Sequence, residues 1–236
     1  MFKRILPVLA GLLIIQHAGA QDPATLKKHY LSVYRQAVYY NDLNTAIGAL
    51  HGYLAVGKSI PYKDTLSMLY FNAKSFVSAL QLAEEVYKAD PANIGAMARA
   101  AECFSELGDP VSSVELYEKV VPKTKSPYYI YKMAIGQYQT KKVKEAEASA
   151  RAVIADTSSK SMGIMFNGVN GGQQAVPLHA AAANLLGVLK MDAGDFTGAK
   201  KEFEQAIEMY PEFEGARQNL EICDKKLNEE GKAKEN

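Results

Sequence analysis

Residues 183–211 read ANLLGVLKMDAGDFTGAKKEFEQAIEMYP, and this stretch decides the fold. Apolar and small residues recur every three or four positions on both sides of a polar turn, as expected for two amphipathic helices joined by a short connection. Gly187 and Ala199 are small enough to let these helices approach closely, while Phe203 fills space against the next hairpin. Pro211 ends the second helix, because its ring cannot continue the backbone hydrogen-bond ladder. The stretch therefore predicts a closely packed helical hairpin.

The same pattern recurs along the chain, because a polar turn is followed five residues later by a small residue. The turns are Asn41-Asp42, Lys74-Ser75, Gly108-Asp109, Lys141-Lys142 and Gly194-Asp195, and the small residues are Ala46, Ala79, Ser113, Ala146 and Ala199. Both series are spaced by 33, 34, 33 and 53 residues. A shared register of this kind predicts five equivalent hairpins.

Leu186, Gly187, Ala199, Phe203 and Pro211 reproduce the spacing of one known repeat, in which Leu-Gly leads to an Ala, an aromatic residue and a closing Pro. The chain thus resembles the tetratricopeptide repeat family over roughly residues 27–228 by the period count. The resemblance implies an all-α fold, a tetratricopeptide-repeat α-solenoid of about five helical hairpins within residues 21–228. It also implies a protein that binds other proteins and is not an enzyme.

Two features depart from a uniform repeat. Gln137 and Lys190 stand where the family prefers an aromatic residue, so we expect thinner helix contacts there. After the last hairpin, residues 214–227 carry an apolar stripe among charges, which is typical of a terminal capping helix. Residues 229–236 are charged, and we expect them to be frayed.

The first 20 residues predict a secretory signal peptide. Lys3 and Arg4 precede an apolar run of eleven residues, and Ala18-Gly19-Ala20 forms a small-residue cleavage site. The run is shorter than the roughly 20 residues of a membrane-spanning helix, so we expect export to the periplasm or outside the cell. An uncleaved N-terminal anchor is the alternative.

Charge and cysteine content exclude several classes of protein. The chain has 27 basic and 26 acidic residues, and cleavage after Ala20 would leave 25 basic ones. Such a balance does not favour nucleic acid or an anionic membrane as partner. Cys103 and Cys223 lie on apolar helical faces and are expected to be buried thiols. His and Cys residues lack the spacing of a zinc site, so we expect no metal and no cofactor.

The interval of 53 residues contains about 19 more than the others, and the extra residues fall at about 158–176. This insertion has an apolar group at Ile164, Met165, Phe166 and Val169, which we expect to be covered, because exposed apolar groups tend to find a surface. It either folds back onto its own helices, filling part of the groove, or forms one wall of a binding site. The two alternatives are compatible.

Residues 52–59 match the phosphate-binding loop pattern, but the context is wrong. That motif needs a strand before it and a helix after it, with free backbone amides facing the phosphate. Here the preceding residues are predicted to be helical, and Pro61 follows closely. We therefore expect a chance match.

In the tetratricopeptide fold the first helix of each hairpin lines the concave side. Residues offset from the packing positions face that side, at the spacing of one helical face. With Phe166 of the insertion, the candidate partner-binding residues are Leu31, Arg35, Met68, Phe71, Tyr128, Tyr131, Ile135, Tyr138, Asn184, Val188 and Met191. Such an aromatic and Met-lined groove suits an extended or helical peptide with apolar anchors. Alternatively, these side chains contact the insertion or a neighbouring first helix.

The sequence leaves three functions open. The first is a non-enzymatic protein interaction scaffold. The second is an envelope assembly or trafficking component of a larger complex. The third is a ligand-binding protein or enzyme with a site between the groove and the insertion, although no nucleophile motif supports it.

Overall fold

The computed structural model describes residues 22–167 and 172–235, with side chains as far as residue 232. The predicted signal peptide and Val169 lie outside the described residues. The chain divides into two compact units, Met1–Lys58 and Ser59–Asn236. In the first unit, α1 (Pro23–Tyr39) and α2 (Leu43–Val56) pack together as one hairpin.

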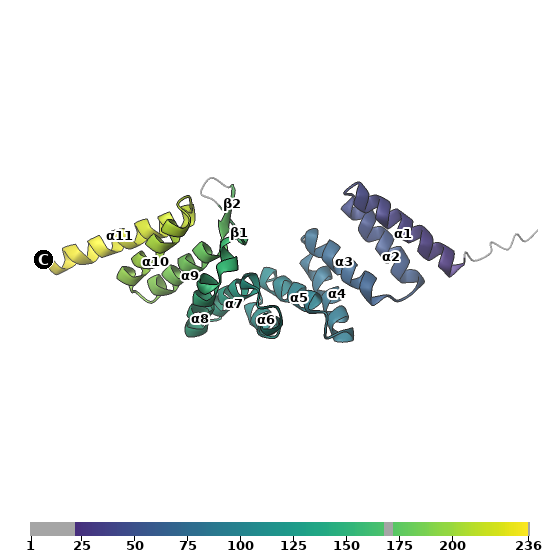
Figure 1. Ribbon diagram of the computed structural model, residues 1–236, viewed down its shortest axis with the longest axis horizontal. Helices are drawn as coiled ribbons and strands as arrows, with labels where there is room; N and C mark the ends of the chain where they lie inside the picture. Colours follow the sequence, from purple (N-terminus) through teal and green to yellow (C-terminus); the bar gives the residue numbers. More distant parts are fainter. Residues whose placement is uncertain (1–21, 168–171, 236) are drawn as a thin grey trace, which may run out of the picture. The chain divides into compact units, whose positions relative to one another are not determined.

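The second unit contains four further hairpins and a terminal helix (Figure 1). Each hairpin pairs a first helix with a second helix, and each packs on the hairpin that follows it. The helices are α3 (Ile60–Asn72), α4 (Phe76–Ala89), α5 (Ile94–Glu106), α6 (Pro110–Thr124), α7 (Pro127–Gln139), α8 (Val143–Ala155), α9 (Leu178–Asp192), α10 (Phe196–Met209) and α11 (Glu214–Glu235). The predicted all-α fold of five hairpins plus a C-terminal helix is confirmed.

All five hairpins turn in the same way, at the residues that set the sequence register. One residue in each turn has a positive φ of 56–80°, the left-handed region: Asn41, Lys74, Gly108, Lys141 and Gly194. The next residue donates its backbone N–H to the carbonyl five positions earlier, at 2.8–2.9 Å. This bond satisfies a carbonyl that the end of a helix would otherwise leave without a partner. Identical turns explain why one period describes all five hairpins.

Three turns also begin the second helix with a side-chain cap. Asp42, Asp109 and Asp195 accept the backbone N–H three residues on at 2.8–3.0 Å. Ser75 and Lys142 occupy the equivalent positions and make no such bond. The hydroxyl groups of Thr45 and Ser112 also donate to Asp42 and Asp109, each at 2.6 Å. These hydroxyl bonds first, and the backbone bonds second, hold the pKa of both carboxyl groups below the usual value.

The small residues do allow close packing between the two helices of a hairpin. A Cβ placed on Gly187 would lie 2.4 Å from Cε1 of Phe203, so the ring lies directly against the glycine backbone. Ala199 and Phe203 are both fully buried. Phe203 thus fills space within its own hairpin, and with Cys223 of α11 it forms a core cluster beyond it.

We expected weaker helix contacts at Gln137 and Lys190, but each of these residues forms a polar pair in place of the apolar contact. Gln137 accepts a hydrogen bond from Ser149 Oγ at 2.8 Å. Lys190 Nζ lies 3.1 Å from Glu202 Oε1, whose side chain is only 11% exposed. Each pair joins the first and second helices of one hairpin. Side chains twelve residues apart therefore hold these hairpins by polar contacts.

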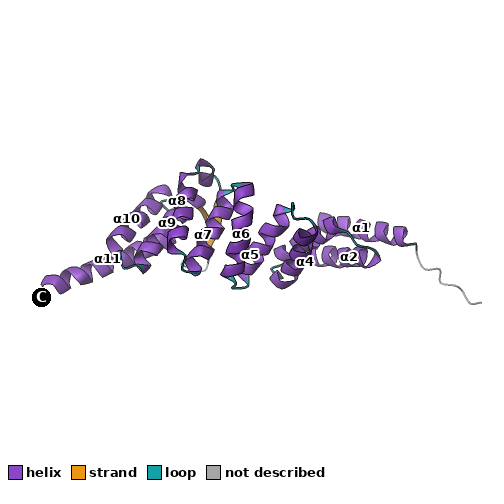
Figure 2. Cartoon of the chain, turned by 90° about the horizontal axis from the view of Figure 1, so that it is seen from below, coloured by secondary structure: helices purple, strands orange, loops and turns teal. Residues whose placement is uncertain are grey.

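The insertion is not a loop but a short 3-10 helix and a β-hairpin. The 3-10 helix covers Thr157–Lys160, and β1 (Gly163–Asn167) pairs antiparallel with β2 (Gln173–Pro177), in the register Met165 opposite Ala175. Figure 2 shows these strands among the helices of the second unit. Alternation explains the strands, since Ile164, Phe166 and Val176 are covered while Met165 and Ala175 are exposed.

The covered face of the β-hairpin packs on its own helices. The Phe166 and Phe213 rings meet edge to face with centroids 5.0 Å apart. The Gln174 amide donates to the Glu212 carbonyl at 2.5 Å and accepts from the Glu214 backbone N–H at 3.3 Å, at the start of α11. The predicted folding back is confirmed for Ile164 and Phe166, whereas Met165 remains 55% exposed.

The remaining expectations concern α11, the cysteines and the phosphate-loop match. The α11 helix continues to Glu235 rather than ending at Leu227, so most of the charged tail is helical. Cys103 and Cys223 are buried free thiols, as predicted. Gly52 to Val56 lie inside α2, which confirms that the backbone amides there belong to a helix. Of the helices in residues 22–167 and 172–235, none is both long and apolar enough to cross a membrane.

We predict that Lys190→Met lowers the free energy of unfolding by about 1–3 kcal/mol, because it leaves the Glu202 carboxylate poorly paired. Arg151 alone would remain, at 3.7 Å from Glu202. Adding Glu202→Leu should restore stability to within about 1 kcal/mol of the original, since two apolar side chains then replace the pair. Urea unfolding measures both values. Lys201→Met, at an exposed position next to Glu202 on α10, is the control. Simple additivity of Lys190→Met and Glu202→Leu would refute the pairing.

Candidate partner-binding surface

The first helices of neighbouring hairpins in the second unit are joined by polar side-chain bonds. Between α3 and α5, Asp64 accepts from Arg99 Nη1 at 2.7 Å and from Asn93 Nδ2 at 3.0 Å. Between α5 and α7, the Tyr128 hydroxyl donates to Glu102 Oε2 at 3.2 Å. These bonds cross between helices rather than following one helix.

The same arrangement continues toward the C-terminus. The Tyr138 hydroxyl of α7 donates to Asp192 Oδ2 of α9 at 2.7 Å. Asn219 Nδ2 of α11 donates to Asn184 Oδ1 of α9 at 3.0 Å. Neighbouring first helices of this row are therefore joined by at least one polar bridge at each step. Bridges of this kind give the surface a defined shape before any partner arrives.

The structure divides the predicted binding residues of the second unit into exposed and covered ones. Met68 is 44% exposed, and Phe71, Tyr128, Ile135, Tyr138, Val188 and Met191 are half-buried. We call these seven residues the first-helix face. Tyr131 and Asn184 are only 3% and 8% exposed. They are not available to a partner, because Tyr131 belongs to the core and Asn184 is bonded to Asn219.

Three more predicted residues lie elsewhere. Phe166 is covered by Phe213 and is a packing residue of the β-hairpin rather than a groove wall. In the first unit, Leu31 is half-buried and Arg35 is exposed, both on α1. That unit has its own hollow of about 180 Å³, which is lined by Val33, Gln36, Ala37, Tyr40, Asp42 and Thr45.

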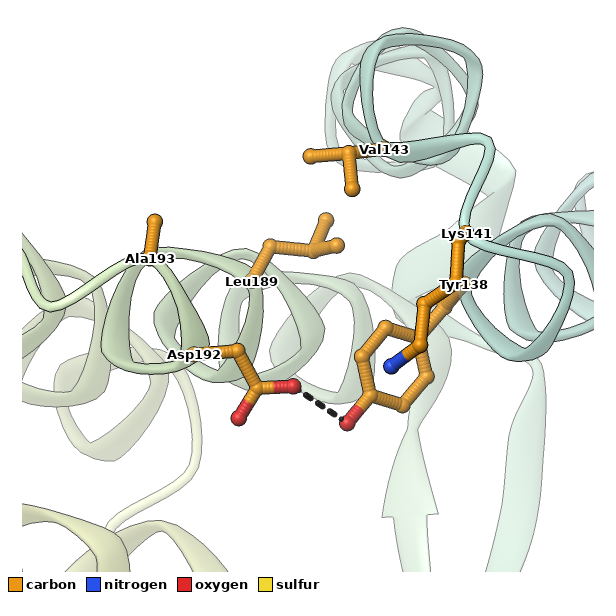
Figure 3. Close-up of a pocket in the computed structure, with 6 residues that line it drawn as sticks. All are labelled: Tyr138, Lys141, Val143, Leu189, Asp192 and Ala193. Carbon is orange, nitrogen blue, oxygen red and sulfur yellow. Dashed lines mark hydrogen bonds between the residues drawn. The ribbon is translucent and has the colours of Figure 1, made fainter.

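Next to the first-helix face is a hollow of about 180 Å³, where the fourth and fifth hairpins turn (Figure 3). Leu189 extends toward Val143, and the Asp192 carboxylate faces the Tyr138 hydroxyl. The Lys141 ammonium group lies 5.7 Å from the centroid of the Tyr138 ring. An adjoining hollow of about 140 Å³ shares Val143, Leu189 and Ala193. Together they offer an apolar floor with charged groups at the rim.

Of the six residues that line this hollow, the sequence predicts only Tyr138 as a binding residue. Val143 is 45% exposed at the first position of α8. An apolar residue between Lys142 and Lys144, directly after a predicted turn, was the available signal. Leu189 gave none, since it is only 6% exposed and follows the core pattern of α9.

Another hollow, of about 460 Å³, is lined by Ile154 of α8, Lys160 of the 3-10 helix, His179 of α9, and Gln205, Glu208 and Met209 of α10. Burial, and then the positive charge of Lys160, lower the pKa of His179. Its Nδ1 atom is itself buried and has no hydrogen-bond partner among the described residues. This ring nitrogen is therefore not exposed to the hollow.

The thiols and acidic groups give no sign of catalysis or metal binding. Burial raises the pKa of Cys103 to about 11 and also raises that of Cys223, so neither is an activated nucleophile. Within residues 22–167 and 172–235, no three His, Cys, Asp or Glu side chains gather as metal ligands would. What this surface offers chemically is shape, apolar contact and a few charges.

Comparison with known proteins supports the fold. Residues 70–135 match the family model of the tetratricopeptide repeat. No curated protein matches the chain. Among solved structures, YrrB, described as a TPR protein with an unusual peptide-binding site, superposes with a TM-score of 0.66 at 14% identity, over 80% of this chain and 89% of YrrB.

Two MamA structures are similar to the same extent. One MamA protein gives a TM-score of 0.64 at 13% identity, covering 79% of this chain and 92% of its own. MamA from Desulfovibrio magneticus RS-1, residue 41 to the end, gives 0.65 at 12% identity, covering 79% and 96%. At such identities the likeness establishes a tetratricopeptide-type fold and nothing further.

We predict that Glu102→Gln stabilises the protein at pH 7 and has no effect at pH 4. Burial raises the pKa of Glu102 above 4.5, although Lys132 and the Tyr128 hydroxyl oppose the shift. The folded protein therefore binds this proton more tightly than the unfolded chain, and stability is lost as the pH rises from about 4.5 through the raised pKa. Thermal midpoints at both pH values measure the effect. Glu115→Gln, at an exposed position on α6, is the control, and equal shifts of the Glu102→Gln midpoint at the two pH values would contradict the argument.

Proposed function

We propose that the protein is a non-enzymatic scaffold that binds a peptide or protein partner on its first-helix face. The observation that carries this proposal is the row of first helices fixed by polar bridges, with apolar side chains between the bridges. Met68 and Phe71 offer apolar contact on α3, and Tyr128, Ile135 and Tyr138 do so on α7.

The bridges matter because they leave few polar groups of this surface without a partner. A partner that covers the first-helix face then buries Met and aromatic side chains without stripping water from isolated charges. The peptide-binding site named for YrrB supports the same kind of function in a protein of similar fold. Peptides with apolar anchors at helical or alternating spacing fit this surface best.

Met68→Ser is expected to weaken partner binding at least about tenfold, because exposed anchor side chains at the centre of an interface contribute most of its affinity. The partner is first identified by crosslinking the full chain in its own cells, and the dissociation constant is then measured with purified proteins. Val77→Ser is the matched control, since Val77 is 57% exposed on α4 of the same hairpin. Equal effects of the two substitutions would place the binding surface elsewhere.

We also propose that the scaffold acts after export, as a component of the cell envelope or a secreted protein. The support is the charged start, the eleven-residue apolar run and the Ala18-Gly19-Ala20 site of the sequence. N-terminal sequencing of protein recovered from its own cells should find Gln21 first. Recovery of the chain with Met1 intact in the cytoplasmic fraction would refute export.

A further inference from the structure

The outer edge of β1 is a row of backbone groups with no hydrogen-bond partner among the described residues. The Leu178 backbone N–H donates to the Met162 carbonyl at 2.8 Å, which fixes the pairing pattern of the β-hairpin. Hydrogen-bonded pairs alternate with non-hydrogen-bonded ones in an antiparallel ladder, so Ile164 and Phe166 bond to β2. The N–H and C=O groups of Gly163, Met165 and Asn167 therefore point away from β2. All three residues are exposed.

This edge lacks the features that usually protect a free strand. Proteins blunt such edges with charged side chains, proline or covering elements. Residues 161–177 contain no Asp, Glu, Lys, Arg or His, and β1 contains no proline. The β2 edge differs, because Pro177 has no N–H to offer. Of the two edges, β1 is therefore the better acceptor for an added strand.

We propose that the β1 edge binds an extended, uncharged segment of a partner polypeptide, which adds to the β-hairpin as a third strand. The site is separate from the first-helix face and rests on the proposed function only in that both bind polypeptide. The outward N–H and C=O groups of β1 recur every second residue, which selects a partner segment in the extended conformation. The side chains of β1 then select which residues that segment can carry. A charged residue would find no ion-pair partner within residues 161–177, whereas an apolar one would lie against Met165.

A second copy of the chain fits this edge less well than an extended segment. The covered face of the β-hairpin lies against α9 and Phe213. Joining two β1 strands antiparallel would bring both sets of helices to the same side of the new sheet, where they compete for space. An extended segment carries no such bulk. Figure 1 shows the two strands projecting from the row of helices.

The test uses the full chain and a capped synthetic peptide with the sequence of residues 172–177, GQQAVP. This peptide is uncharged and copies the strand that β1 already accepts as a neighbour. Amide NMR should show slowed hydrogen exchange at Gly163, Met165 and Asn167 on titration, with no change at Gln173 and Ala175. A peptide carrying Glu at the position of Ala175 should bind more weakly.

Met165→Pro should weaken binding of the peptide about tenfold, equivalent to about 1.4 kcal/mol, because it removes an outward N–H without removing a hydrogen bond within the β-hairpin. Ala175→Pro makes the same change on the other edge and should leave affinity unchanged. Met165→Lys keeps the N–H but adds a charge, and should also weaken binding. The exchange protection of Ile164 and Phe166 checks that each variant keeps its β-hairpin.

Three results would overturn the proposal. They are equal losses for Met165→Pro and Ala175→Pro, absence of peptide binding, and self-association of the full chain that Met165→Pro abolishes. The last would assign the edge to a second copy. Because Met68→Ser leaves this edge intact, failure at the first-helix face and failure at β1 are distinguishable.

Discussion

The tight turn between the two helices of each hairpin is the constraint on which the rest of the structure depends. In every hairpin one residue adopts a left-handed conformation, and the next donates to the carbonyl five positions back. That bond fixes which turns of the two helices face each other. Only small residues then fit at the closest points, as the contact between Gly187 and Phe203 shows. The sequence repeats because every hairpin needs the same turn and the same small residues.

Because the hairpins of the second unit are equivalent, their first helices form a row, and variation between repeats appears on its surface. Polar bridges such as Tyr128 to Glu102 and Tyr138 to Asp192 join successive members of the row. These bridges use residues that would otherwise be free to bind a ligand. The surface is therefore best described as an apolar face held in shape by satisfied polar groups.

The insertion adds a different kind of element to this fold. Its strands exist because alternate residues can be buried against α9 and Phe213, while the others remain in water. Gln174 connects the β-hairpin to the first residues of α11, so the insertion also stabilises the terminal helix. A helical repeat protein thereby gains a strand edge, which is the site we propose for an added strand.

The sequence by itself determined the five hairpins, their turns, the terminal helix, the buried cysteines and the covering of Ile164 and Phe166. These features follow from local spacing, which repeats and can be counted. Only the tertiary structure decided that Lys190 pairs with Glu202, that Tyr131 is buried and that the insertion forms strands. Each of these depends on which side chain lies opposite across a helix or strand boundary, and a one-dimensional period contains no information about that partner.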